Sequence, residues 1–285
     1  MADTTTTTLT EAVPTIVAAA LLELSEGDII RPLVTNVNFA GQPGVVHQTP
    51  FVQKLTSEAD DSLSSQALDS TTSDETSPAE ATVGVHGSYV QLKEIAQLAT
   101  IDDMAAVAGS LIGQSIRVRR DLDLATLFTS FTTNQGTAIA SLAPADLYDA
   151  YASLRTYFAP LPYNLVLHPQ QIWSSSGLIS LFDNSSDAIQ TAGPGTVGED
   201  FARMGFAGLA LGFSLFSDAN IVLTTNNGSG AAFSRAGIEY VQKRPFRIDI
   251  EGDAAEVATR IVGTEMWGES VLRNLHGNEM QFTAS

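Results

Sequence analysis

The sequence contains no cysteine, and this absence removes several kinds of chemistry from consideration. A chain without thiols has no disulfide framework, no thiolate nucleophile and no thiolate metal site. The absence of cysteine does not identify a cellular compartment.

Basic residues are also scarce, because 14 Lys and Arg stand against 32 Asp and Glu and leave a formal net charge of −18. A nucleic-acid groove neutralises phosphates with Lys and Arg, so this composition argues against such a groove. Passive enclosure of DNA inside a container needs no groove and is compatible with the charge.

Long apolar runs are missing as well. The stretch Ile16–Leu22 is far too short to span a bilayer, and the acidic residues Asp3 and Glu11 precede it where a signal peptide carries basic residues. We therefore expect a soluble protein that is made in a cytoplasm and has no membrane partner.

What the sequence does have is a long acidic arm, Gly44–Leu92. Two strand-like runs, Val45–Val52 and Thr82–Leu92, flank a tract at 56–80 that has no Lys or Arg. Three acids of this tract are candidates for contacts between subunits: Glu58, Asp60 and Asp61. The apolar residues of the tract are too few to offset the entropy of ordering its backbone. The arm is therefore either disordered or covered by another subunit, and we expect proteases to cut it in a free subunit but not in an assembly.

Apolar periodicity predicts one helix before this arm and one helix after it. Thr10–Leu24 has Thr10 as its N-cap and one apolar face, so it either docks on a partner or covers the local core. Ile101–Phe128 would be a helix about 42 Å long, which we interpret as a spine packed against a sheet. Its expected buried stripe has these members: Ile101, Met104, Ala108, Leu111, Ser115, Val118, Leu122 and Ala125, with Ala105, Ile112 and Phe128 widening it.

The densest basic cluster of the chain lies on this long helix, at Arg117, Arg119 and Arg120. One interpretation is a solvated helix face with local ion pairs, each of which stabilises by a few tenths of a kcal/mol. The other is that these arginines receive the acidic arms of neighbouring subunits.

A compact α/β unit is predicted from Ser141 onward, followed by strands. The unit contains a helix at Pro144–Phe158, a strand at Tyr163–Leu167 and a short helix that His168-Pro169 opens. The strands after it are expected at three places, with a Gly277-Asn278 turn before the last: Phe246–Ile250, Val257–Val262 with Glu269–Leu275, and Met280–Phe282.

No motif supports an enzyme. Gly193, Gly195 and Gly198 match G-x-G-x-x-G, but no strand precedes them and Glu199-Asp200 would repel a phosphate. The histidines lie far apart, and none has a metal ligand four residues away: His47, His86, His168 and His276. We expect no catalytic residue, no cofactor and no metal.

The order of the parts is informative where motifs are not: an N-terminal arm, an acidic two-stranded loop, a long helix, an α/β unit and return strands. This order resembles that of the major capsid protein of tailed bacteriophages, the α+β Hong Kong 97 fold. Echoes of that family include LVLHPQQIW at Leu165–Trp173 and VLRNLHGNEMQF at Val271–Phe282. By the resemblance, the chain divides into five parts: an N-terminal arm (1–43), the E-loop with its join (44–92), a peripheral domain with the spine helix (93–140), an axial domain (141–236) and peripheral return strands (237–285).

The resemblance implies a structural protein of the virion capsid, assembled in the host cytoplasm. Pentamers and hexamers would close an icosahedral shell around double-stranded DNA without binding a specific sequence. The implied partners are other copies of the chain, a portal protein and, in some cases, a cement protein. Because no long charged helical segment precedes the arm, we expect a separate scaffolding protein.

Some members of this family crosslink a loop lysine to an asparagine of a neighbouring subunit. The candidates here are Lys54 with Asn278 or Asn274, and Glu279 as a base. We expect Lys54 to be an ordinary solvated strand residue instead, because no sequence motif specifies the bond. A single monomer band from mature particles in a denaturing gel would exclude the crosslink.

Two other functions are compatible with these observations. An encapsulin-type shell has the same fold and encloses cargo protein instead of a genome, so the nucleic-acid content of particles distinguishes it. A secreted adhesin or surface-layer protein fits the Thr and Ser content, but the missing signal peptide argues against it. Such a protein would be a monomer or form sheets.

Overall fold

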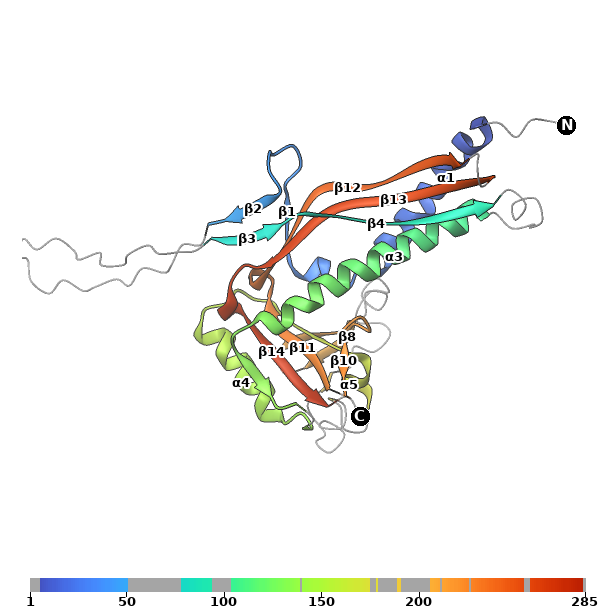
Figure 1. Ribbon diagram of the computed structural model, residues 1–285. Helices are drawn as coiled ribbons and strands as arrows, with labels where there is room; N and C mark the ends of the chain where they lie inside the picture. The colour runs from blue at the N-terminus through green and yellow to red at the C-terminus, as the bar shows by residue number, and fades with distance from the viewer. Residues whose placement is uncertain are drawn as a thin grey trace, which may run out of the picture.

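The computed structural model of the chain describes residues 6–50, 78–93, 104–138, 140–174, 178, 189–190, 206–210, 212–225, 227–253 and 257–283. These residues are a mixture of helices and strands in two parts, one built on a four-stranded sheet and one on an eight-stranded sheet. A long helix, α3 (Met104–Thr126), runs beneath the first sheet and reaches the second (Figure 1).

The N-terminal segment lies along the four-stranded sheet. It consists of helix α1 (Thr6–Gly27), the 3₁₀ turn η1 (Arg31–Leu33) and strand β1 (Thr35–Asn38). The predicted helix at Thr10–Leu24 is thus present and longer than expected. Ile16, Ala20 and Leu24 are buried on one face of α1, so this face covers the local core.

The two long helices approach each other closely because α3 presents glycine to α1. A Cβ added to Gly109 would lie 2.4 Å from the carbonyl oxygen of Ile16. One turn further along, a Cβ on Gly113 would lie 2.6 Å from the carbonyl oxygen of Ala20. Both distances are far inside van der Waals contact, so only glycine permits this backbone-to-backbone packing.

The arm begins as a hairpin in which β2 (Val46–Thr49) pairs antiparallel with β3 (Ala79–Thr82). The hairpin projects sideways from the four-stranded sheet, and the chain then continues into β4 (Gly84–Lys93) (Figure 1). The tract between the two strands, with Lys54, Glu58, Asp60 and Asp61, lies outside the described residues.

The four-stranded sheet has the order β1-β12-β13-β4, with β12 at Ile238–Asp253 and β13 at Ala258–Val271. The two strands predicted at Val257–Val262 and Glu269–Leu275 are one strand in the structure. The reason is that Gly263, Glu265 and Trp267 continue the inward-facing alternation of β13 between them.

The eight-stranded sheet has the order β5-β14-β11-β6-β9-β8-β7, and β10 pairs with β11. Its elements and the turns beside them are β5 (Asn134–Gly136), α4 (Pro144–Thr156), β6 (Tyr163–Leu167), α5 (Pro169–Trp173), β7 (Ile189–Gln190), β8 (Phe206–Ala210), β9 (Phe213–Ser217), β10 (Leu223–Thr224), β11 (Asn227–Ser234), η3 (Arg235–Gly237), η4 (Asn274–His276) and β14 (Gly277–Thr283).

The last strand corrects two predictions. Gly277 and Asn278 are the first residues of β14 and do not form a turn. The strand also pairs with β11 of the second sheet, so residues 237–285 do not all return to the four-stranded sheet. Alternation identifies a strand, but it does not identify the partner of that strand.

The buried face of α3 agrees with the predicted stripe only in part. Ala108 and Ile112 are buried as expected, and Ile116 is buried one turn further along, whereas Leu111 is 50% and Val118 is 38% exposed. The helix continues into the 3₁₀ turn η2 (Leu127–Ser130), whose Phe128 is buried. The buried row also includes a charged residue, Arg120, which a stripe of apolar residues cannot predict.

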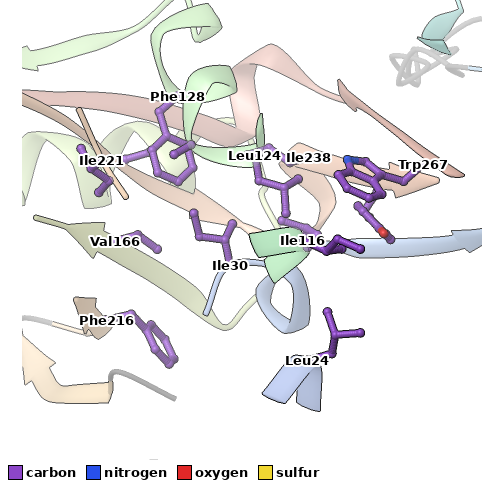
Figure 2. Close-up of a cluster of buried hydrophobic side chains, with 14 of the residues drawn as sticks. Leu24, Ile30, Ile116, Leu124, Phe128, Val166, Phe216, Ile221, Ile238 and Trp267 are labelled. Carbon is purple, nitrogen blue, oxygen red and sulfur yellow. The ribbon is translucent and has the colours of Figure 1, made fainter. Parts of the chain in front are cut away.

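A shared hydrophobic core joins the two sheets. Figure 2 shows Phe128, Val166 and Phe216 in one cluster with Ile116 and Trp267, so side chains of both sheets meet at the lower part of α3. A second cluster lies on the other face of the eight-stranded sheet, beneath α4 and α5, and includes Leu147, Leu154 and Ile172. The hairpin base has a small cluster of its own.

Candidate functional site

The basic run on α3 separates into three different environments. Arg119 is 58% exposed and pairs with Asp123 at 2.9 Å, while Arg117 contacts Glu23 of α1 at 3.2 Å. Arg120 is 1% exposed. The interpretation of a solvated face is therefore wrong for Arg120, and its burial also takes it away from any surface that an acidic arm of a neighbour could reach. A contact of Arg117 or Arg119 with a neighbouring arm stays a prediction.

Arg120 lies between two carboxylates from distant parts of the chain. Its Nη1 donates to Asp28 Oδ2, and its Nη2 donates to Glu265 Oε2. The other oxygen of Glu265 accepts from the Tyr240 hydroxyl at 3.2 Å and from Gln242 Nε2 at 2.6 Å. Burial by itself lowers the pKa of Arg120. The neighbouring Asp28, Tyr240 and Glu265 together raise this pKa by more than burial lowers it, so the guanidinium stays charged. Burial raises the pKa of Tyr240 and keeps its hydroxyl a neutral donor.

Sequence reasoning missed this network, although one signal of it was available. Glu265 occupies an inward-facing position of β13 between Gly263 and Trp267. An acid at such a position needs a buried cationic or donor partner, because an unpaired buried charge is strongly destabilising. The network ties the N-terminal segment at Asp28 to α3 and to the four-stranded sheet.

Beside it, Asp121 holds the start of η1 to α3. Its two carboxylate oxygens accept hydrogen bonds from the backbone N–H groups of Ile29 and Ile30, both at 3.3 Å. Burial raises the pKa of Asp121 to about 8, and the negative charges of Asp218 and Asp28 act in the same direction. Burial also raises the pKa of Asp218, whose Oδ1 accepts from the N–H of Asn220 at 2.8 Å.

The hairpin is fixed to the four-stranded sheet at its base. Thr49 Oγ1 donates to Glu239 Oε2 of β12 at 2.6 Å. Within the hairpin itself, the N–H of Val83 donates to the carbonyl of Val45 at 2.7 Å and extends the pairing of β2 with β3. On the adjoining edge strand β4, Val85 and Tyr89 are each 65% exposed. A projecting hairpin beside an exposed apolar strand is a surface that an assembly contact can use.

The two asparagines considered for a crosslink lie in different environments. Asn278 is fully buried, donates from Nδ2 to the carbonyl of Ala150 at 3.1 Å and accepts from Ser153 Oγ at 3.2 Å. A lysine of a neighbour cannot reach this side chain, so Asn278 is not a crosslink acceptor in this conformation. Asn274 is exposed on η4, and Glu279 accepts from Gln281 Nε2 at 2.8 Å. The lysine candidate, Lys54, lies outside the described residues.

The histidines have separate structural environments. His86 stacks on Trp267 with ring centroids 3.8 Å apart, His168 accepts the N–H of Gln170 as the N-cap of α5, and His276 is the buried last residue of η4. Within the described ranges, no three His, Asp or Glu side chains are grouped so that they could hold a metal ion. The glycine motif at Gly193, Gly195 and Gly198 lies outside those ranges.

Among the described helices, none is long and apolar enough to cross a membrane. No protein-family model matches the sequence, and neither does any curated protein. Similarity to solved structures is extensive instead. The chain superposes on a protein of Mycobacterium phage Che8 with a TM-score of 0.63 at 17% identity, over 84% of this chain and 85% of that one.

Two further solved structures cover the chain to a similar extent. The capsid of Ralstonia phage GP4 matches with a TM-score of 0.64 at 13% identity, over 89% of this chain and 87% of that one. The SrpI encapsulin of Synechococcus elongatus matches with a TM-score of 0.62 at 10% identity, again over 89% and 87%. At these identities the similarity shows the fold, which is the fold of tailed-phage major capsid proteins, as the order of parts in the sequence indicated.

Proposed function

We propose that the protein is the structural subunit of a tailed-phage capsid, forming pentamers and hexamers of an icosahedral shell around double-stranded DNA. The observation that carries the proposal is the match in fold to capsid subunits along nearly the whole chain, as with the 89% covered by the phage GP4 capsid.

In this proposal each part of the chain has a role in the shell. Residues 1–43 form the N-terminal arm, 44–92 the E-loop, and 93–140 the peripheral domain with α3 as its spine. Residues 141–236, together with β14, form the axial domain, and the strands β12 and β13 of 237–285 complete the peripheral domain. The strand pairing of β14 with β11 supports this modified boundary.

The projecting hairpin supports a ring of subunits. In a closed ring each subunit uses two different surfaces, one toward each neighbour, so one subunit can extend its arm over the next around the whole cycle. The acidic tract at the tip of the arm would be covered only after assembly. Obligate contacts of this kind bury large areas, which would supply the apolar partners that the tract lacks.

Negative-stain microscopy and sedimentation of the purified chain test the proposal. We expect uniform closed shells or capsomers, formed by the chain alone or with its scaffolding protein. Stable monomers under all conditions would contradict a shell subunit, and flat sheets would indicate a surface-layer protein. Correctly sized shells from the chain alone would exclude the need for a separate scaffold.

A second candidate, an encapsulin-type compartment, is favoured by the similarity to the SrpI encapsulin at a TM-score of 0.62. The content of particles from the natural source separates the two candidates. We expect nuclease-protected double-stranded DNA, whereas enclosed protein without DNA would identify a compartment. A portal at one vertex and an external cement protein are further expectations of the phage proposal.

A further inference from the structure

One end of the eight-stranded sheet, where β6 and β14 begin, carries a group of exposed large apolar side chains. We call this group the aromatic patch, and its members are Tyr157 (44% exposed), Phe158 (73%), Leu161 (60%) and Leu275 (45%). Single exposed apolar residues are common on protein surfaces, but a cluster of four is a mark of an interface.

The aromatic patch rests on three segments that are bonded to one another. The Ser234 hydroxyl donates to the carbonyl of Pro160 at 2.6 Å, and the N–H of Arg273 donates to the carbonyl of Gly237 at 3.1 Å. The loop after α4, the turn η3 and the turn η4 therefore form one platform. Phe158 has a φ of 55°, a left-handed conformation that residues other than Gly, Asn and Asp seldom adopt. A strained backbone that holds a phenylalanine in solvent is consistent with a use for that side chain.

The platform is also basic, in a chain that is strongly acidic. Arg155 and Arg235 are exposed beside the patch, and the N–H of Phe158 donates to the carbonyl of Arg155 at 3.1 Å. Arg273 lies close enough to His276 to lower the pKa of that histidine in addition to the effect of burial. The arginines of this platform are thus a local exception in a chain whose net charge is −18.

The opposite end of the same sheet has a smaller apolar surface. Trp173, at the end of α5, is 58% exposed, and Val222, just before β10, is 64% exposed. Both β6 and β14 run antiparallel to β11, so they begin at the same end of the sheet. Trp173 follows the end of β6, and β10 pairs with the first residues of β11, which lie opposite the end of β14. The two apolar surfaces are therefore separated by the length of the strands.

We propose that the aromatic patch of one subunit docks on the Trp173–Val222 surface of the next copy around the ring. This inference rests on the proposed shell function and specifies which surfaces meet. Two unlike surfaces at opposite ends of a subunit are what a closed head-to-tail ring requires. Aromatic and arginine side chains are also those that dominate binding energy at protein interfaces. In Figure 1 the hairpin projects on the side where β14 begins, so one neighbour receives both the arm and the aromatic patch.

The absence of cysteine makes a direct test possible. We would introduce two cysteine pairs in separate variants, Phe158→Cys with Trp173→Cys and Leu161→Cys with Val222→Cys, and oxidise the assembled particles mildly with diamide. A disulfide forms only between residues whose Cα atoms approach within about 7 Å. We expect a ladder of trimers, tetramers and larger multimers from at least one pair in a non-reducing gel. Each single variant can give dimers at most and serves as the control. Assembled particles without a ladder from either pair would overturn the proposal.

A second test measures the contribution of the patch to assembly. The double variant Phe158→Asn with Leu161→Ser keeps a residue that tolerates the left-handed conformation and removes both apolar side chains. We expect the concentration needed for assembly to rise by about tenfold or more, because exposed interface anchors contribute at least this much. Tyr148→Ser, at a side chain that is 58% exposed on the helix α4 before the patch, should leave assembly unchanged.

The two tests separate failure of the docking surface from failure of the proposed function. Circular dichroism and thermal unfolding of the subunits establish that each variant is folded. If the unmodified chain forms no shells or capsomers, the proposed function is wrong. If the unmodified chain assembles and the double variant assembles equally well, the shell function stands and the docking surface is wrong.

Discussion

Arg119 and Arg120 are neighbours in the sequence, yet the subunit uses their charges in opposite ways. Arg119 is mostly exposed and pairs with Asp123, whereas Arg120 is buried between Asp28 and Glu265. We expect Arg120→Ala to lower the free energy of unfolding by about 3–5 kcal/mol, because it leaves two buried carboxylates without their cation. Arg119→Ala should lower it by less than about 1 kcal/mol, because an exposed ion pair contributes little.

Urea unfolding of the unassembled subunit, followed by far-ultraviolet circular dichroism, measures both variants under identical conditions. Equal losses of unfolding free energy from the two substitutions would show that burial does not determine how much each arginine contributes to stability. The double variant Arg120→Met with Glu265→Gln is a useful extension, because it removes opposite charges together and should cost less than Arg120→Ala.

Asp121 makes the stability of the subunit depend on pH. Its pKa is about 8 in the folded protein and 3.8 as the ordinary value, so between these limits the folded state holds a proton that the unfolded state has released. The free energy of unfolding must therefore fall as pH rises through this window, by at most ~1.4 kcal/mol per pH unit. We expect Asp121→Asn to reduce the fall in unfolding free energy between pH 5 and pH 8. The amide oxygen of the new side chain can still accept a hydrogen bond from a backbone N–H group.

Urea midpoints of the subunit from pH 5 to pH 8.5 test this expectation. Glu269, whose pKa burial raises to about 7, should leave a smaller residual slope of the same sign. The control is Asp249→Asn, at a carboxylate that is 56% exposed, and it should leave the profile unchanged. An unaltered profile for Asp121→Asn would mean that this carboxyl is ionised in the folded protein at neutral pH.

At the scale of elements, the contact between α1 and α3 depends on Gly109 and Gly113. We expect Gly109→Ala to destabilise the subunit by about 1–3 kcal/mol, because its Cβ would collide with the backbone of Ile16. The higher helix propensity of alanine, worth up to about 1 kcal/mol, acts in the opposite direction and is smaller. Thermal unfolding of the variant beside Gly252→Ala, where an added Cβ meets nothing within 4 Å, provides the measurement and its control. A more stable Gly109→Ala protein would show that α1 and α3 can move apart without a loss of stability.

The sequence predicted most elements but fewer of their contacts. The strand Tyr163–Leu167 and the short helix that His168-Pro169 opens follow from local residues, and the structure has both. The buried face of α3 was predicted only in part, because a hydrophobic stripe cannot include a residue such as Arg120, whose partners Asp28 and Glu265 lie far away in sequence. The pairing of β14 with β11 was missed for a related reason, since a register between distant strands is determined by the core that they share.

At the scale of the whole molecule, the two sheets behave as one unit only if the core between them couples them. Phe128, Val166 and Phe216 pack in a cluster that also contains Trp267 and Ile261 of the four-stranded sheet (Figure 2). Leu147, by contrast, belongs to the cluster under α4, on the far face of the eight-stranded sheet. A cavity at Leu147 therefore weakens one sheet directly and the other only through cooperativity.

We expect Leu147→Ala to lower the unfolding free energy by about 2–5 kcal/mol, as fully buried leucines do when truncated. If the shared core makes unfolding a single transition, hydrogen exchange of the amides in β12 and β13 should accelerate by the same factor as that of the amides in β6 and β11. Mass spectrometry of peptides from both sheets, in the unassembled subunit at low urea concentration, measures the two factors together. The exposed variant Tyr148→Ser, one residue along α4, controls for effects of substitution on the helix itself. Acceleration confined to β6 and β11 would show that the four-stranded sheet opens independently, and that α3 and its core transmit no stability between the two halves of the subunit.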